Sequence, residues 1–106
     1  MSTPVTYNAN EVNSLLYGTT IAGGTKTSTG TAAQLAATPV SGVCQLIITA
    51  LLTNTNKVYI GSSAVTTTTG VPLAAGDSVS LQIGDLSQVY VLAAVSGEGV
   101  SYVYTA

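Results

Sequence analysis

Apolar and polar residues alternate along several short stretches of this 106-residue chain, and this alternation restricts the fold more than any other feature. Residues 57–60 read Lys-Val-Tyr-Ile, and residues 78–83 read Ser-Val-Ser-Leu-Gln-Ile. A period of two is typical of strands that bury one face. Between these stretches lie Gly70, Pro72 and Gly76, which are turn residues. Residues 57–90 therefore contain two predicted strands and an unusually long ordered connection, a kind of segment that is often functional.

Further strands are predicted on both sides of this stretch, and no segment shows helical periodicity over the length of a long helix. Turn residues bound each predicted strand, for example at residues 54–56 and 96–99. The sequence therefore predicts an all-β fold: a single antiparallel β-sandwich or jelly-roll-like barrel of about six strands. The predicted strands comprise residues 25–33, 43–52, 57–62, 78–83, 88–95 and 100–104.

The strand predicted at residues 43–52 is apolar on both faces. Ile47 points to the face opposite Leu46 and Ile48, because successive side chains of a strand alternate. A strand with two apolar faces is either central in a sheet or covered by a neighbouring subunit. We expect Ile47, together with Tyr59 and Val103, to lie in a subunit interface.

Residues 1–24 differ in composition from the rest and are predicted to form an N-terminal arm, with the sandwich domain at residues 25–106. Asn10 could cap a short helix over residues 11–17, which would be marginal in isolation. One interpretation is a frayed terminus, and the other is an arm that becomes ordered on a partner, with Gly23 and Gly24 as its hinge. The predicted partner-binding residues of the arm are Tyr7, Val12, Leu15, Leu16 and Tyr17.

Charged residues make up only 6% of the chain, and the net charge is −2. Average soluble domains carry about 25% charged residues, so this surface must consist mainly of hydroxyl, amide and glycine groups. Such a surface gives little electrostatic protection against self-association, since only Lys26 and Lys57 could protect strand edges. Two basic residues also make nucleic acid and anionic membranes improbable partners. The apolar run at residues 43–52 is about half the length of a membrane-spanning helix.

The sequence contains no arrangement of residues typical of an enzyme or a cofactor site. It has no histidine, which is the commonest general base and metal ligand, and its four carboxylates fall singly in the predicted arm or in turns. We therefore expect no enzymatic activity, no cofactor and no metal cluster, although Asp77 or Asp85 could hold an isolated ion. Cys44 is the only cysteine and is predicted to be a buried structural thiol of a protein made in a reducing cytoplasm. The tyrosines within strands are expected to pack across strands rather than to form a sugar platform.

Several strand and turn motifs resemble a small β-module common in virion proteins of tailed phages. The resemblance covers roughly residues 25–106 and implies a β-sandwich, a structural role and often trimers. It rests on V-Y-I-G at 58–61, V-T at 65–66, G-V-P-L at 70–73, A-G-D-S-V at 75–79, D-L-S-Q-V-Y-V at 85–91 and G-E-G-V-S-Y at 97–102.

These observations predict a non-enzymatic virion structural protein, made in the host bacterial cytoplasm. The expected role is a capsid decoration (cement) protein whose partners are the major capsid protein and further copies of itself, with a trimer favoured. The alternative is a binding module of a fibre tip or tail that recognises a host surface glycan or protein. In that case residues 62–76 would form the recognition surface at one end of the sandwich.

Overall fold

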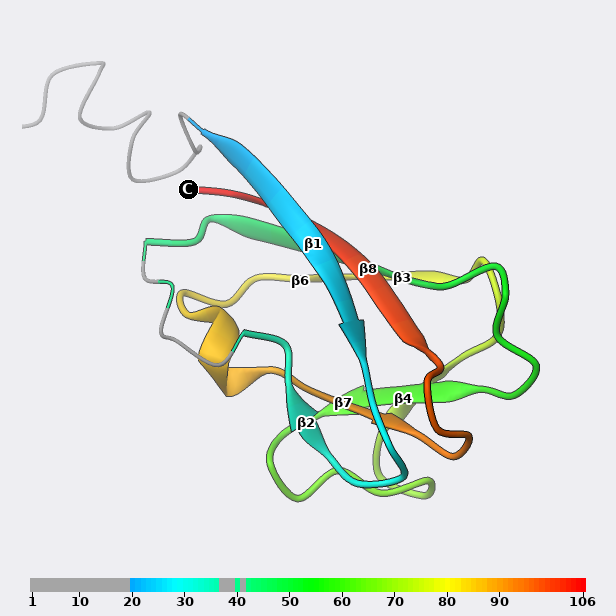
Figure 1. Cartoon of the computed structure of the whole chain (residues 1–106). Coiled ribbons are helices and arrows are strands. Elements are labelled where there is room, and N and C mark those ends of the chain that lie inside the picture. Colours follow the sequence, from blue (N-terminus) through cyan, green and yellow to red (C-terminus); the bar gives the residue numbers. More distant parts are fainter. Residues whose placement is uncertain (1–19, 37–39, 41) are drawn as a thin grey trace, which may run out of the picture.

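The computed structural model describes residues 20–36, 40 and 42–106, which form two antiparallel four-stranded sheets packed face to face (Figure 1). The prediction of an all-β sandwich is confirmed. The first sheet contains, in spatial order, β1 (Ile21–Thr27), β8 (Gly99–Thr105), β3 (Gln45–Ala50) and β6 (Ser78–Leu81). The second sheet contains β2 (Ala33–Gln34), β7 (Tyr90–Ala93), β4 (Val58–Gly61) and β5 (Val71–Leu73), and the 3-10 helix η1 (Leu86–Gln88) precedes β7.

The core lies between the two sheets and is built from alternate residues of the central strands. In β3, Leu46 and Ile48 are fully buried, and they face Val58 of β4 and Val91 of β7 from the opposite sheet. The residues between them, such as Ile47, point to the outer face of the first sheet, as their pairing partners do. Burial therefore alternates along β3, β4 and β7, and it separates core side chains from surface side chains even where the sequence is apolar on both faces, as in β3.

The described residues form eight strands, whereas the sequence predicted about six. The two additional strands are β2, which has two residues, and β5, which has three. β5 contains Pro72, a residue that strongly favours a turn or an edge strand, and it is indeed an edge of the second sheet. Both strands exist because β7 and β4 offer hydrogen-bonding partners, which the local sequence does not reveal.

Residues 57–90 span both sheets. β4 and β5 pair in the second sheet, and the chain then crosses to the first sheet, where β6 pairs with β3. The connection at residues 62–70 is ordered by its own side chains. The Thr66 hydroxyl accepts from the backbone N–H groups of Thr68 and Thr69, and Val65 packs into the space left by Gly61 and Gly70.

The prediction that Gly23 and Gly24 form a hinge is wrong. Both lie within β1 and are paired with Val103 and Tyr102 of β8. A methyl group at Gly23 would collide with the Tyr102 carbonyl oxygen, and one at Gly24 would lie 3.0 Å from the Tyr102 hydroxyl oxygen. Glycine is needed here because β8 approaches closely, so the sheet begins at Ile21, within the predicted arm. The predicted helix at residues 11–17 lies outside the described residues.

The burial pattern of β3 predicts unequal effects for two neighbouring substitutions. We expect Leu46→Ala to lower the free energy of unfolding by about 2–5 kcal/mol, because it opens a cavity in the core. We expect Ile47→Ala, the matched control on the outer face, to change it by only about 0.5 kcal/mol. Urea denaturation of both variants measures the difference. Equal losses of stability would contradict the unequal burial of the two faces of β3.

Candidate functional site

The outer face of the first sheet is the most distinctive surface of the described residues. It is formed by the residues of β1, β8, β3 and β6 that alternate with the core residues. Ile21, Ile47 and Val103 on this face are 77%, 42% and 41% exposed. Isolated apolar residues on a surface are ordinary, whereas large contiguous apolar patches are typical of contact sites.

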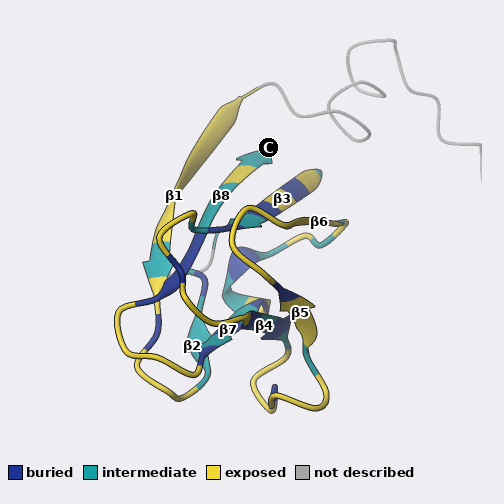
Figure 2. Cartoon of the chain, turned by 90° about the vertical axis from the view of Figure 1, so that its right-hand side faces the viewer, coloured by how far each residue is buried: buried dark blue, intermediate teal, exposed yellow. Residues whose placement is uncertain are grey.

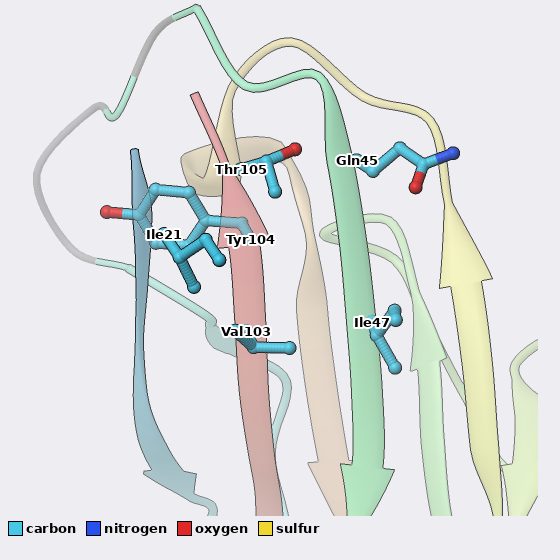
Figure 3. Close-up of a pocket in the computed structure, with 6 residues that line it drawn as sticks. All are labelled: Ile21, Gln45, Ile47, Val103, Tyr104 and Thr105. Carbon is cyan, nitrogen blue, oxygen red and sulfur yellow. The ribbon is translucent and has the colours of Figure 1, made fainter. Parts of the chain in front are cut away.

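These three side chains line a shallow hollow of about 170 Å³ on the outer face. Ile47 and Val103 are directly opposite each other on β3 and β8, and Ile21 is opposite Thr105, two residues further along β8. Figure 3 shows Ile47 and Val103 projecting from neighbouring strands, with Gln45 and Thr105 at one end of the hollow. We call Ile21, Ile47 and Val103 the apolar cluster.

The residues around the apolar cluster carry no charge. On this face the strand registers place Thr25, Ser101, Thr49 and Ser78, whose side chains are all hydroxyls. Thr49 and Ser78 join across β3 and β6 through a hydroxyl–hydroxyl hydrogen bond of 2.7 Å. Burying such a face costs little, because no ion has to be desolvated and hydroxyl groups find partners easily. The face is therefore suited to contact with another protein surface.

The structure brings together two of the three predicted interface residues. Ile47 and Val103 are adjacent, whereas Tyr59 lies on the outer face of the second sheet, between Leu92 and Pro72. Ile21 was not among the predicted interface residues, because residues 1–24 were predicted to form the arm, whereas β1 begins at Ile21. Alternation of Ile21 with Ala22 at the start of the strand is too short a pattern to reveal it. The partner-binding residues predicted in the arm, Tyr7, Val12, Leu15, Leu16 and Tyr17, lie outside the described residues.

The tyrosines of β8 contribute to packing, as predicted. The rings of Tyr102 and Tyr104 are stacked, with centroids 6.4 Å apart and planes inclined by 16°. Both are half-buried against the core on the inner face of the first sheet, and Tyr102 extends over Gly24 of β1. An aromatic side chain that covers a glycine on an edge strand supports the pairing of that strand.

Each carboxylate among the described residues stabilises a turn. Asp77 accepts a hydrogen bond from the backbone N–H of Ala74, and Asp85 accepts from the N–H and hydroxyl of Ser87 at the start of η1. The N–H and hydroxyl of Ser87 hold the pKa of Asp85 below its usual range, against a smaller opposing effect of desolvation. Both carboxylates lie in turns, as the sequence predicted.

Glu98 links two loops at one end of the sandwich. Its carboxylate accepts from the N–H and the hydroxyl of Thr55 and from the N–H of Asn56. These hydrogen bonds, that from the Thr55 N–H above all, hold the pKa of Glu98 below its usual range although desolvation raises it. Asn54 beside it is buried and exchanges two hydrogen bonds with the backbone of Gly99. The turn between β3 and β4 is thereby fixed to the turn before β8.

The part of the chain that the structure describes contains no cluster of three or more potential metal-ligating side chains. Within the same residues, no helix has the length and apolar character needed to span a membrane. Cys44 is half-buried rather than buried as predicted, because it precedes β3 and lies beside the open end of the sheet. Its thiol is 3.8 Å from the Gly42 carbonyl oxygen.

A second hollow, of about 420 Å³, opens between the sheets beside the edge strands β5 and β6. Its described lining is mainly aliphatic, with Ser62, Thr69 and Gln88 as polar members, and contains no aromatic or charged side chain. Sugar sites commonly combine an aromatic face with several polar groups. The hollow adjoins the long connection proposed as a recognition surface, but its lining does not favour a glycan.

Comparison of the chain with family models, with curated proteins and with solved structures found no match.

The contacts of Glu98 predict a pH-dependent contribution to stability. Because its pKa is lowered by folding, the contribution is complete above the ordinary glutamate pKa of about 4.3 and is lost as pH falls through the lower folded value. We expect Glu98→Gln to lower the denaturation midpoint at pH 7 and to weaken the decrease in stability between roughly pH 5 and pH 2. Thermal unfolding at several pH values measures both effects.

Thr55→Val provides the matched control for this prediction, since it removes one hydroxyl donor to Glu98 but keeps the backbone N–H donors. We expect it to reduce the pH dependence less than Glu98→Gln does. If Glu98→Gln retained the full pH dependence of the natural chain, the carboxylate would not be the group responsible.

Proposed function

We propose that the protein is a non-enzymatic structural component of a phage virion, a capsid decoration protein that binds the head shell and associates with further copies of itself. The single observation that carries the proposal is the uncharged outer face of the first sheet with its exposed apolar cluster. The resemblance of the strand and turn motifs to virion β-modules supports the assignment to a phage particle. Both lines of argument favour protein contact over chemistry.

The surface suits a protein that acts in many copies. One hollow of about 170 Å³ with three exposed aliphatic side chains provides only a small contact area, and a small contact gives weak binding. Repetition of a weak contact on a symmetric shell produces strong overall attachment, because each bound copy raises the effective concentration of the next contact. Low net charge allows neighbouring copies to approach without strong repulsion.

The proposal is tested with particles that lack the protein. Purified chain is added to such particles, and the bound copies are counted after sedimentation. We expect saturable binding with a copy number comparable to that of the major capsid protein, and greater resistance of the particles to heat. A few copies at the tail, or hits on a glycan array without shell binding, would instead favour the alternative of a recognition module.

A substitution within the apolar cluster should weaken this attachment. We expect Val103→Lys to reduce the affinity for particles by about tenfold or more, because a lysine ammonium would have to be desolvated in the contact. Thr67→Lys, on the exposed connection between β4 and β5, is the matched control and should bind normally. Circular dichroism checks that both variants fold. Equal binding by both variants would exclude the outer face as the contact surface.

A further inference from the structure

β1 forms a long open edge of the first sheet. Among the described residues it pairs only with β8, and its seven residues compare with four in β6, the other edge of the same sheet. The edges of the second sheet, β2 and β5, have two and three residues. Figure 2 shows that β1 is exposed along most of its length. Natural sheets usually shorten or otherwise protect such edges, because unpaired backbone groups bind other strands.

The hydrogen bonds at the two ends of β1 identify the backbone groups that face this open edge. Thr20 and Ala106 exchange two backbone hydrogen bonds of 2.9 and 3.0 Å, and the Ser28 N–H donates to the Glu98 carbonyl oxygen over 3.0 Å. In an antiparallel ladder, bonded and non-bonded pairs alternate, so the even-numbered residues of β1 bond to β8. The backbone groups directed to the open edge are those of Ile21, Gly23, Thr25 and Thr27.

The usual protective features are scarce along this edge. β1 contains no proline, and its one charged residue is Lys26, which pairs with the core residue Val100 and so lies on the inner face of the sheet. Gly23 and Gly24 occupy its centre, where β8 requires glycine, and neither carries a side chain that would obstruct a second strand. The edge is therefore open to a strand of about the same length.

We propose that β1 pairs antiparallel with β1 of a second copy, about a two-fold axis at Gly24. All seven residues then pair: Ile21 with Thr27 of the other copy, and Gly23 with Thr25. Each of these pairs occurs twice and exchanges two N–H to carbonyl bonds. The four hydrogen-bonded pairs thus supply all the donors and acceptors that β1 directs to its edge. This inference deepens the proposed function and rests on its self-association.

A second copy of β1 fits the open edge of β1 in length and in charge. In this register each Lys26 faces Ala22 of the other copy, so the two ammonium groups are not opposed. Length, alternation and hydrogen-bonding direction match at both ends, which a two-fold pairing requires. The axis is perpendicular to the sheet, so the two apolar clusters lie on the same side of one continuous eight-stranded sheet, four strands from each copy.

The pairing closes on itself and therefore predicts a dimer rather than the trimer that the family resemblance implies. Light scattering of the full chain over a concentration series should give a limiting mass twice that of the 10.6 kDa chain. Amide exchange by NMR should show protection of Ile21, Gly23, Thr25 and Thr27 that increases with concentration. The same amides should become unprotected on dilution.

Three variants separate the edge contact from other effects. Thr25→Pro removes an N–H that faces the open edge but no hydrogen bond to β8, and it should give a monomer. Thr25→Val keeps that N–H and should remain dimeric. Ser80→Pro changes β6, the opposite edge of the sheet, and should also remain dimeric. Val79 and Ile48 form a hydrogen-bonded pair between β6 and β3, so the N–H of the next residue, Ser80, faces outward and its loss breaks no hydrogen bond to β3. Circular dichroism establishes whether each variant is folded.

Several results would overturn the pairing. The first is a monomer whose edge amides are unprotected at all concentrations. The second is a trimer or an open polymer that the Ser80→Pro substitution abolishes. The third is a monomer whose edge amides are protected at every concentration. The last result would mean that another segment of the same chain covers β1.

If Thr25→Pro fails to fold, the concentration dependence of amide exchange in the natural chain by itself tests the pairing. None of these measurements uses capsid particles. The strand pairing can therefore be disproved while binding to the shell is confirmed, and binding to the shell can be disproved while the pairing is confirmed.

Discussion

Alternate apolar residues of the central strands pack between the two sheets, and this packing holds the sandwich together. With charged residues at 6% of the chain, ion pairs contribute little to the folding of this protein. Leu46 and Ile48 from one sheet and Val58 and Val91 from the other are almost fully removed from water. Each such side chain contributes about 1.5–3 kcal/mol on burial, which must offset the entropy lost when the strands are ordered. The sandwich therefore requires its strand registers, since a shift by one residue would expose this set.

The few carboxylates of the described residues stabilise the loops that connect the strands. Asp85 caps η1 and also accepts from the Val40 N–H, so it fixes two segments that are distant in sequence. Glu98 does the same for the turns at 54–56 and 96–99 through three hydrogen bonds. A carboxylate bound in this way is poorly placed to act as an acid or base, because its charged form is already stabilised by fixed donors. The polar chemistry of the chain thus supports its architecture.

Two surfaces of the first sheet remain exposed, and they differ in kind. The outer face of β1, β8 and β3 offers aliphatic side chains surrounded by hydroxyl groups, whereas the edge of β1 offers backbone donors and acceptors. Contacts of the first kind depend on shape and apolar area, and those of the second kind depend on strand direction and register. The outer face and the edge of β1 are therefore distinct surfaces, and each sets its own requirements on a partner.

The fold class and the positions of the main strands could be predicted from the sequence, because the period of two at residues 58–61 and 78–81 and the apolar run at residues 43–52 are local patterns. The sequence also determined that histidine chemistry is absent and that the surface is nearly uncharged. Two features depend on long-range pairing instead: Gly23 and Gly24 belong to a strand because β8 pairs with them, and Pro72 lies in an edge strand because β4 pairs beside it. The adjacency of Ile47 and Val103, and with Ile21 the apolar cluster itself, likewise depend on strand order, since residues far apart in the chain become neighbours only through long-range pairing.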